Sequence, residues 1–164
     1  MRSGWFGFCH APDYDVSMLP ALLIGSLTLI INMLIQVSAL MATVRIFLHL
    51  MNSDRLPPTF GADTWVMSVV LMVLFFGHVL QFATWALLFL YLDEFSEFGT
   101  AFYHSVVNFT SLGYGDIVMS QKWRVLGGLE AANGILMFGL TTSTFVAVMG
   151  RLFDRRKSTQ TPQT

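Results

Sequence analysis

One short stretch of the chain, Thr110 to Asp116, combines residue types that suit the binding of a cation. It reads TSLGYGD, and two glycines, Gly113 and Gly115, flank a tyrosine. Glycine adopts backbone conformations that other residues avoid, so the stretch is predicted to be irregular rather than helical. Residues 100–110, which lead into it, are mostly apolar and favour a short helix. The C-terminal end of such a helix carries partial negative charge, which favours a cation beside it.

The composition indicates that the bilayer is the solvent of this chain. Hydrophobic residues make up 54% of its 164 residues and charged residues 12%, against about 25% charged in a soluble domain. The net charge of −1 leaves no basic excess that could bind nucleic acid. The single cysteine, Cys9, excludes a disulfide framework within the chain and a cysteine-based zinc site. No nucleophile–base pair or metal-binding cluster stands out, so we expect neither an enzyme nor a cofactor.

Three long runs that are nearly free of charge predict three membrane-spanning helices. Met18–Val44 contains no Asp, Glu, Lys or Arg over 27 residues, and Thr64–Leu92 contains none over 29. Val125–Met149 contains only Glu130. A spanning helix needs about 20 apolar residues, so the 100–110 segment is too short to cross and suits a re-entrant helix. The sequence therefore predicts an all-α membrane protein in which the irregular backbone after the re-entrant helix is buried or lines water.

The basic residues near the ends of the spans predict the orientation of the chain. The loop between the first two spans and the C-terminal tail lie on the same side of the membrane. Together they carry six of the nine basic residues: Arg45, Arg55, Arg151, Arg155, Arg156 and Lys157. We expect this side to be cytoplasmic, which places the N-terminus outside the cell and the C-terminus inside in a multi-pass protein of the cell membrane.

The TSLGYGD stretch resembles the selectivity filter of potassium channels, which commonly reads TVGYGD. Ala101–Asp116 is similar to the pore helix and filter of that family, and the run that starts at Gly134 is similar to its inner helix. The second span resembles the outer helix. The resemblance covers about residues 64–153. It leaves residues 1–63 as an extracellular N-terminus, an extra span and a cytoplasmic loop, and residues 154–164 as a short cytoplasmic tail.

The resemblance implies a filter in which backbone carbonyls replace the hydration shell of K⁺. The carbonyls that would hold the ion belong to Ser111, Leu112, Gly113 and Tyr114. The Ser111 hydroxyl would add the innermost ring of oxygens, and the Tyr114 ring would brace the filter against the pore helix. One chain supplies one filter strand, so the resemblance implies a fourfold homotetramer with K⁺ as the permeant ion and no cofactor.

The resemblance also assigns supporting residues, some of which depart from the family pattern. Asp116 would sit at the outer mouth of the filter, and Val107 stands where many bacterial members place a Glu that braces this aspartate. Tyr103 and His104 stand where many members have aromatic residues, and His104 is either a packed residue or a sensor. The residues expected to support the filter are Thr110, Gly115, Asp116, His104 and Glu130.

Glu130 is an acid within a span, and such residues are functional by default. Three interpretations of it stay open. It is a brace behind the filter that replaces the Glu absent at Val107, or a ligand or proton site, or an interfacial residue that pairs with Lys122 or Arg124 or is capped by water.

The third span is expected to line the inner cavity of the pore. Matching the family places Ile135, Phe138 and Thr142 toward the pore, with Val146 one turn deeper, and this spacing of three and four defines one helix face. Gly134 occupies the position of a flexible glycine. Thr142 has an alternative role in helix packing.

Two polar residues at similar membrane depth are expected to dock the first span on the second. With the N-terminus outside, the first span has its midpoint near Asn32 and the second near His78. Polar groups that face lipid at this depth are costly, so a hydrogen bond between these side chains would hide both. The alternatives are that each residue bonds to its own helix backbone, or that His78 faces the pore helix.

A passive K⁺-selective channel is the function that the resemblance implies. A weakly selective cation channel stays open, because Leu112 and Val107 differ from the usual residues and could loosen the filter, and so does a non-conducting partner or sensor subunit. No span carries Arg or Lys at every third position, so we expect no steep voltage dependence. The basic tail Arg155–Lys157 is a topology signal or a site for anionic lipid.

Overall fold

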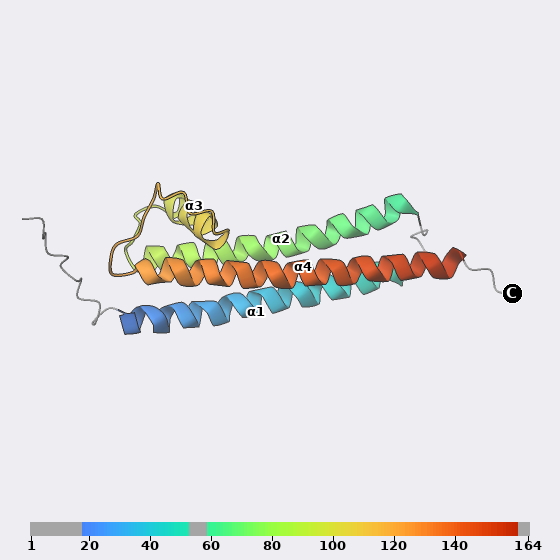
Figure 1. Ribbon diagram of the computed structural model, residues 1–164, viewed down its shortest axis with the longest axis horizontal. Coiled ribbons are helices and arrows are strands. Elements are labelled where there is room, and N and C mark those ends of the chain that lie inside the picture. Colours follow the sequence, from blue (N-terminus) through green and yellow to red (C-terminus); the bar gives the residue numbers. More distant parts are fainter. Residues whose placement is uncertain (1–17, 53–58, 161–164) are drawn as a thin grey trace, which may run out of the picture.

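The computed structural model consists of four α-helices and has no strand in the residues that it describes, 18–52 and 59–160. Residues 1–17, 53–58 and 161–164 lie outside the described residues, and with them the predicted extracellular N-terminus, Cys9 and Arg55. The helices are α1 (Met18–Met51), α2 (Phe60–Tyr91), α3 (Phe98–Phe109) and α4 (Arg124–Gln160). The three long helices run side by side, and the short α3 lies at one end of the bundle beside α2 and α4 (Figure 1).

All three long helices have the length and composition to cross a membrane. This confirms the predicted all-helical membrane fold with three spans. The 37 residues of α4 correspond to about 55 Å of helix, which exceeds the roughly 30 Å of a bilayer core. Large apolar side chains cover much of the outer surface, such as Leu34 at 64% exposed and Phe76 at 60%. This surface is suited to contact with lipid or with other subunits.

Helices α1 and α4 run further than their apolar cores. α1 continues past Arg45 to Met51, and the tail predicted from residue 154 is helical as far as Gln160. The continuation of α4 has a simple reason, because arginine and lysine favour helices and no proline follows until residue 162. Arg156 Nε also forms an ion pair of 2.5 Å with Asp63 Oδ2, which fastens this end of α4 to the first turn of α2.

Two clusters of buried apolar side chains hold the bundle together, one beside α3 and one near the opposite end. The cluster beside α3 is rich in aromatic rings from three helices. Phe109 of α3 lies between Phe82 of α2 and Phe138 of α4, with ring centroids 5.0 and 5.7 Å away. The second cluster fastens α2 to α1 and α4 through mostly aliphatic side chains, which are Phe47, Val66, Val70, Leu74, Val148 and Leu152.

A polar cluster in the middle of the bundle docks α1 on α2 and α4. Gln81 Nε2 donates to Gln36 Oε1 over 2.8 Å, and Gln36 Nε2 donates to Thr141 Oγ1 over 3.0 Å. His78 Nε2 lies 3.0 Å from the same threonine hydroxyl. These side chains bring the middle of all three long helices together, and such bonds average roughly 0.6 kcal/mol in membranes. They set the register of docking more than its strength.

The predicted hydrogen bond between Asn32 and His78 is not formed. Asn32 Nδ2 donates to the carbonyl of Thr28 on its own helix over 2.9 Å, and His78 turns to Thr141 on α4. The predicted contact between the first two spans exists, but its partners are Gln36 and Gln81. Depth in the membrane does not determine the direction in which a side chain points around its helix.

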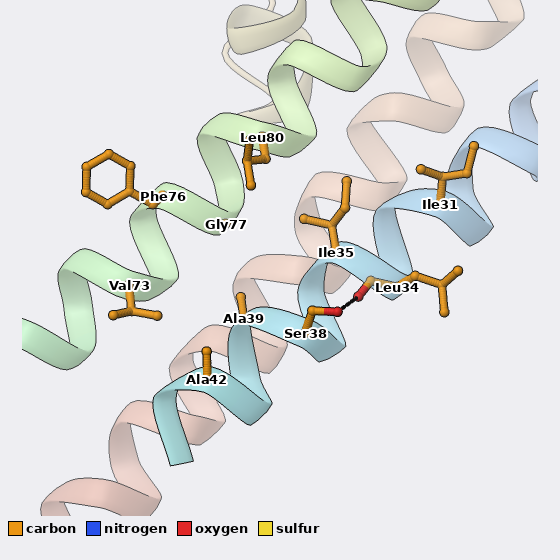
Figure 2. A pocket seen from close by; sticks show the side chains of 10 residues that line it. All are labelled: Ile31, Leu34, Ile35, Ser38, Ala39, Ala42, Val73, Phe76, Gly77 and Leu80. Carbon is orange, nitrogen blue, oxygen red and sulfur yellow. Dashed lines mark hydrogen bonds between the residues drawn. The ribbon is translucent and has the colours of Figure 1, made fainter. Parts of the chain in front are cut away.

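α1 and α2 approach each other closely where both have small residues. A Cβ placed on Gly77 of α2 would lie 2.9 Å from the Cβ of Ala39 on α1. Figure 2 shows these two residues beside Ala42 and Ser38 in an apolar groove between the helices. The Ser38 hydroxyl is satisfied within its own helix, because it donates to the Leu34 carbonyl over 2.8 Å.

Candidate functional site

The C-terminal end of α3 is closed by the backbone of the TSLGYGD segment, residues 110–116. The Ser111 N–H donates to the Asn108 carbonyl over 2.8 Å, and the Leu112 N–H donates to the Val107 carbonyl over 2.9 Å. With a left-handed residue at Ser111, this pair of bonds is a Schellman motif. The helix end and the start of the segment are therefore one rigid unit.

Alternate residues of the segment have left-handed backbone conformations. The φ angle is 57° at Ser111, 58° at Gly113 and 73° at Gly115. Glycine adopts these values freely, and glycine is the usual residue at the position that Ser111 occupies in a Schellman motif. A non-glycine residue in this region costs of order 1–3 kcal/mol, and such residues concentrate at functional sites. Ser111 is thus a strained residue in an otherwise glycine-adapted segment.

Two side-chain hydrogen bonds fix the ends of the segment to α3. At the start, the Thr110 hydroxyl donates to the Val106 carbonyl over 2.7 Å. At the end, the Tyr103 hydroxyl donates to Asp116 Oδ2 over 2.8 Å. This bond to the carboxylate raises the pKa of Tyr103, because it stabilises the neutral phenol. Tyr103, which stands where many members of the resembled family have an aromatic residue, therefore holds the segment through its hydroxyl.

His104 is buried on α3, which matches the packed interpretation, and it links α3 to the chain that leaves the segment. Its Nδ1 lies 3.1 Å from the Ile117 carbonyl, and its Nε2 lies 2.8 Å from Asn108 Nδ2. Neutral imidazole with the proton on Nδ1 satisfies both contacts, since Nδ1 then donates to the carbonyl and Nε2 accepts from the amide. Burial lowers the pKa of His104, with the backbone bond to Ile117 acting in the opposite direction.

Glu130 of α4 contacts α3 and is fully buried. Its Oε1 lies 2.5 Å from Ser105 Oγ. In the described part of the chain Glu130 forms no ion pair, so pairing with Lys122 or Arg124 is not observed. Among the three interpretations of Glu130, the contact with α3 agrees with a brace behind the TSLGYGD segment.

Gly134 is the point where α4 allows the end of α3 to approach. A Cβ on Gly134 would overlap the carbonyl oxygen of Phe109. Helix α4 is continuous through this position, from Arg124 to Gln160. The glycine expected to be a flexible position is therefore a close-packing position in this structure.

The residues expected to line the inner cavity share one face of α4 but differ in exposure. Ile135 and Val146 are 63% and 62% exposed, and Thr142 is also exposed, with its hydroxyl bonded to its own helix. Phe138, in contrast, turns into the bundle and packs on His78, with ring centroids 4.7 Å apart. Within one chain this ring contacts His78 of α2 and Phe109 of α3, and its assignment to the pore face stays a prediction. The packing role considered for Thr142 belongs to its neighbour Thr141.

The Tyr114 ring is largely exposed in the single chain. It is 66% exposed, as is most of the TSLGYGD segment, including Leu112 at 55%. The predicted brace by this ring stays a prediction, and the hydrogen bond that holds the end of the segment to α3 is formed by Tyr103 and Asp116.

Several residues of the site were not predicted from the sequence. Ser105 contacts both Glu130 and the Phe82 carbonyl, and its signal is a small hydroxyl residue within an apolar helix. Gln36 and Gln81 gave a similar signal, as amides in the middle of predicted spans. The pairing of Asp63 with Arg156 gave no sequence signal, because the pairing of charges far apart in the sequence depends on the arrangement of α2 and α4.

Comparison with known proteins agrees with this arrangement. A family model described as an ion channel matches residues 66–151, which extend from α2 through α3 and the TSLGYGD segment into α4. The potassium voltage-gated channel protein Shal of Drosophila melanogaster is 29% identical over 72 residues, which are 40% of this chain and 13% of that protein. The chain thus spans only a small part of this relative, and no solved structure matches it. Because the family match covers more than half of the chain, this protein belongs to the ion channel family.

Proposed function

We propose that this protein is a potassium channel in which the TSLGYGD segment of four identical chains forms the selectivity filter. The observation that carries the proposal is the alternation of left-handed residues at Ser111, Gly113 and Gly115, anchored directly to the end of α3. In an extended strand, successive carbonyls point to opposite sides. Left-handed conformations at every second residue allow them to turn to one side, as a ring of carbonyls around K⁺ requires.

The position of the segment supports the same function. It follows the C-terminal end of a short helix, where the helix dipole favours a cation. The residues 110–116 are exposed in the single chain, and a strand of exposed polar backbone at membrane depth needs protein or water around it. A fourfold ring of chains supplies both, since it covers Tyr114 and Leu112 on the outside and encloses the carbonyls of Ser111, Leu112, Gly113 and Tyr114.

The strained Ser111 adds a reason for ion binding at the inner end of this filter. Its hydroxyl takes no part in the Schellman motif, in which Ser111 and Leu112 donate through their backbone N–H groups. We assign the hydroxyl to the innermost ring of oxygens. Ile135, Thr142 and Val146 would then line the cavity on the cytoplasmic side of this ring.

The orientation follows from the same arrangement. The end of the bundle that carries α3 faces the outside of the cell. The end with Arg45, Arg151 and the Asp63–Arg156 ion pair faces the cytoplasmic side of the cell membrane. Arg155–Lys157 would lie on the last turns of α4 where anionic lipid headgroups are within reach.

Ion flux into liposomes tests the proposal and separates it from two alternatives. Purified protein should take up rubidium or potassium and largely reject sodium, and Gly113→Ala should abolish flux because alanine is strained at a φ of 58°. Equal uptake of sodium and potassium by the natural protein would favour a weakly selective cation channel. A folded tetramer without flux under any condition would favour a non-conducting subunit.

A further inference from the structure

A chain of hydrogen-bonding groups connects three helices behind the TSLGYGD segment. Ser105 of α3 lies between Glu130 of α4 and the backbone carbonyl of Phe82 on α2. Its hydroxyl oxygen is 2.5 Å from Glu130 Oε1 and 2.9 Å from the Phe82 carbonyl oxygen. Both Ser105 and Glu130 are completely buried. This arrangement joins α3, which carries the segment, to its two supporting helices at one point.

Counting hydrogen atoms determines which group donates in this chain. A serine hydroxyl has one hydrogen and cannot donate to both neighbours at once. The Phe82 carbonyl has none, so it can only accept. Both short contacts are satisfied when Ser105 donates to Phe82 and Glu130, as a neutral carboxylic acid, donates to Ser105. With an ionised Glu130, one of the two contacts would join two acceptors without a hydrogen between them.

The charges around Glu130 agree with an uncharged acid. In the described residues no cation pairs with it. Its Oε2 is buried without a close hydrogen-bond partner, and the polar neighbour of its carboxyl group besides Ser105 is the neutral side chain of Asn108. The histidines on the helices beside it are His78 on α2 and His104 on α3, and their hydrogen bonds go to other residues. An isolated buried carboxylate is very costly, so the neutral form is the one that this site accommodates.

The remaining charged groups of the neighbouring elements lie elsewhere. On α1, Arg45 and His49 belong to the opposite end of the helix. On α4, Arg124 is the first residue and lies almost two turns before Glu130, while Lys122 stacks on the ring of Trp123. Asp116 is engaged with Tyr103 on the exposed side of α3. No group on these elements offers Glu130 a compensating positive charge.

We propose that Glu130 is a positioning residue that holds α3 in place as a neutral hydrogen-bond donor, through Ser105, and that removal of its proton at alkaline pH releases this hold. The proposal rests on the assignment of the TSLGYGD segment as a filter. In this proposal, Glu130 supports the filter on the side away from the cytoplasm, and the support depends on the protonation of Glu130. It differs from a salt bridge or a metal site in one decisive respect. An amide, which is neutral and can donate, should replace the carboxylic acid.

Infrared spectroscopy tests the protonation state without any need for conduction. Protein with isotope-labelled glutamate, in detergent at neutral pH, should show the carbonyl band of one protonated carboxylic acid per chain. The band should be absent in Glu130→Gln and retained in Glu97→Gln, a matched control because Glu97 is exposed at the start of α3. It should shift in Ser105→Ala, where the acid loses its acceptor. A spectrum with only ionised carboxylates in the natural protein would overturn the proposal.

Flux measurements then test the positioning role. Glu130→Gln should conduct like the natural protein at neutral pH and should lack the loss of conduction that the natural protein shows at alkaline pH. At every pH, the conduction of Glu130→Val should decline about three- to tenfold faster than that of the natural protein. This factor corresponds to the loss of one hydrogen bond. If Glu130→Val does not assemble, Ser105→Ala provides the same comparison. Failure of Glu130→Gln to conduct, with the carboxylic acid band present in the natural protein, would contradict the positioning role and leave the channel assignment intact.

Discussion

The Tyr103 hydroxyl donates a hydrogen bond of 2.8 Å to the carboxylate of Asp116, thirteen residues further along the chain. Tyr103 lies on α3 and Asp116 is the last residue of the TSLGYGD segment. The bond therefore closes a loop over the segment, whose other end is fixed to α3 by the Schellman motif. The segment is held at both ends by the helix that precedes it.

Removal of this bond should loosen the outer end of the filter. Tyr103→Phe keeps the ring and deletes the hydroxyl, so we expect conduction to decline severalfold faster during sustained opening, with normal assembly. The raised pKa of Tyr103 gives a second readout. Its stabilising effect is complete below the pKa of an unfolded tyrosine, about 10, and is lost as pH rises through the higher folded value. Equal rates of decline in the natural protein and the variant would contradict this role.

His104 should make the same region sensitive to acid. Its pKa is lowered by burial, so the folded protein binds this proton less readily than the unfolded chain. Stability is therefore complete above the ordinary histidine pKa of about 6.5 and falls as the pH drops below it. Protonation also places a hydrogen on Nε2, which then faces the Asn108 amide instead of accepting from it.

Thermal unfolding of the purified protein between pH 7.5 and 5 measures this effect. The natural protein should lose stability over this range, and His104→Gln should reduce the loss. His49→Gln serves as a control, since His49 is exposed in the last turn of α1. An identical pH dependence in all three proteins would show that His104 does not titrate in this range.

Two substitutions of Ser111 should separate backbone strain from ion binding. Ser111→Gly removes the strain of a left-handed serine and should raise stability by about 1 kcal/mol, yet it should weaken rubidium binding because the hydroxyl is lost. Ser111→Ala loses the hydroxyl and keeps the strain. Isothermal titration with rubidium and thermal unfolding measure the two properties. Unchanged rubidium affinity in both variants would remove the hydroxyl from the ion site.

Gly134 should tolerate no side chain, whereas Gly139 on the same helix should. A Cβ at 134 would overlap the Phe109 carbonyl, while one at 139 meets nothing within 4 Å. Gly134→Ala should therefore displace the end of α3, cost roughly 1–3 kcal/mol through overpacking and impair flux. Gly139→Ala should conduct normally. Equal behaviour of the two variants would contradict the close-packing role of Gly134.

The membrane fold could be predicted from the sequence because its signal is simple. The absence of charge between Met18 and Val44 and between Thr64 and Leu92 directly reflects the cost of burying charge in lipid. The short helix was predicted because its apolar run is too short to cross, and the irregular segment after it because it contains two glycines. The lengths of α1 and α4 were not, because their last turns lie beyond the apolar core, where hydropathy carries no signal.

The partners of individual side chains were harder to predict. Asn32 and His78 lie at matching depths, but the rotation of each helix turns them toward Thr28 and Thr141 instead. Phe138 was placed toward the pore by matching the family, and within one chain its ring packs between Phe109 and His78. These details depend on how four helices fit together, which a linear pattern of residues does not contain.

The reversal potential in planar bilayers is the most direct test of the central claim, that the TSLGYGD segment forms a potassium-selective filter. Purified protein is studied with potassium on one side and sodium on the other, and Gly113→Ala is measured in parallel. We predict a reversal potential displaced far toward the value at which potassium alone would be at equilibrium, and no such current in the variant. A reversal potential near zero for the natural protein would contradict the account.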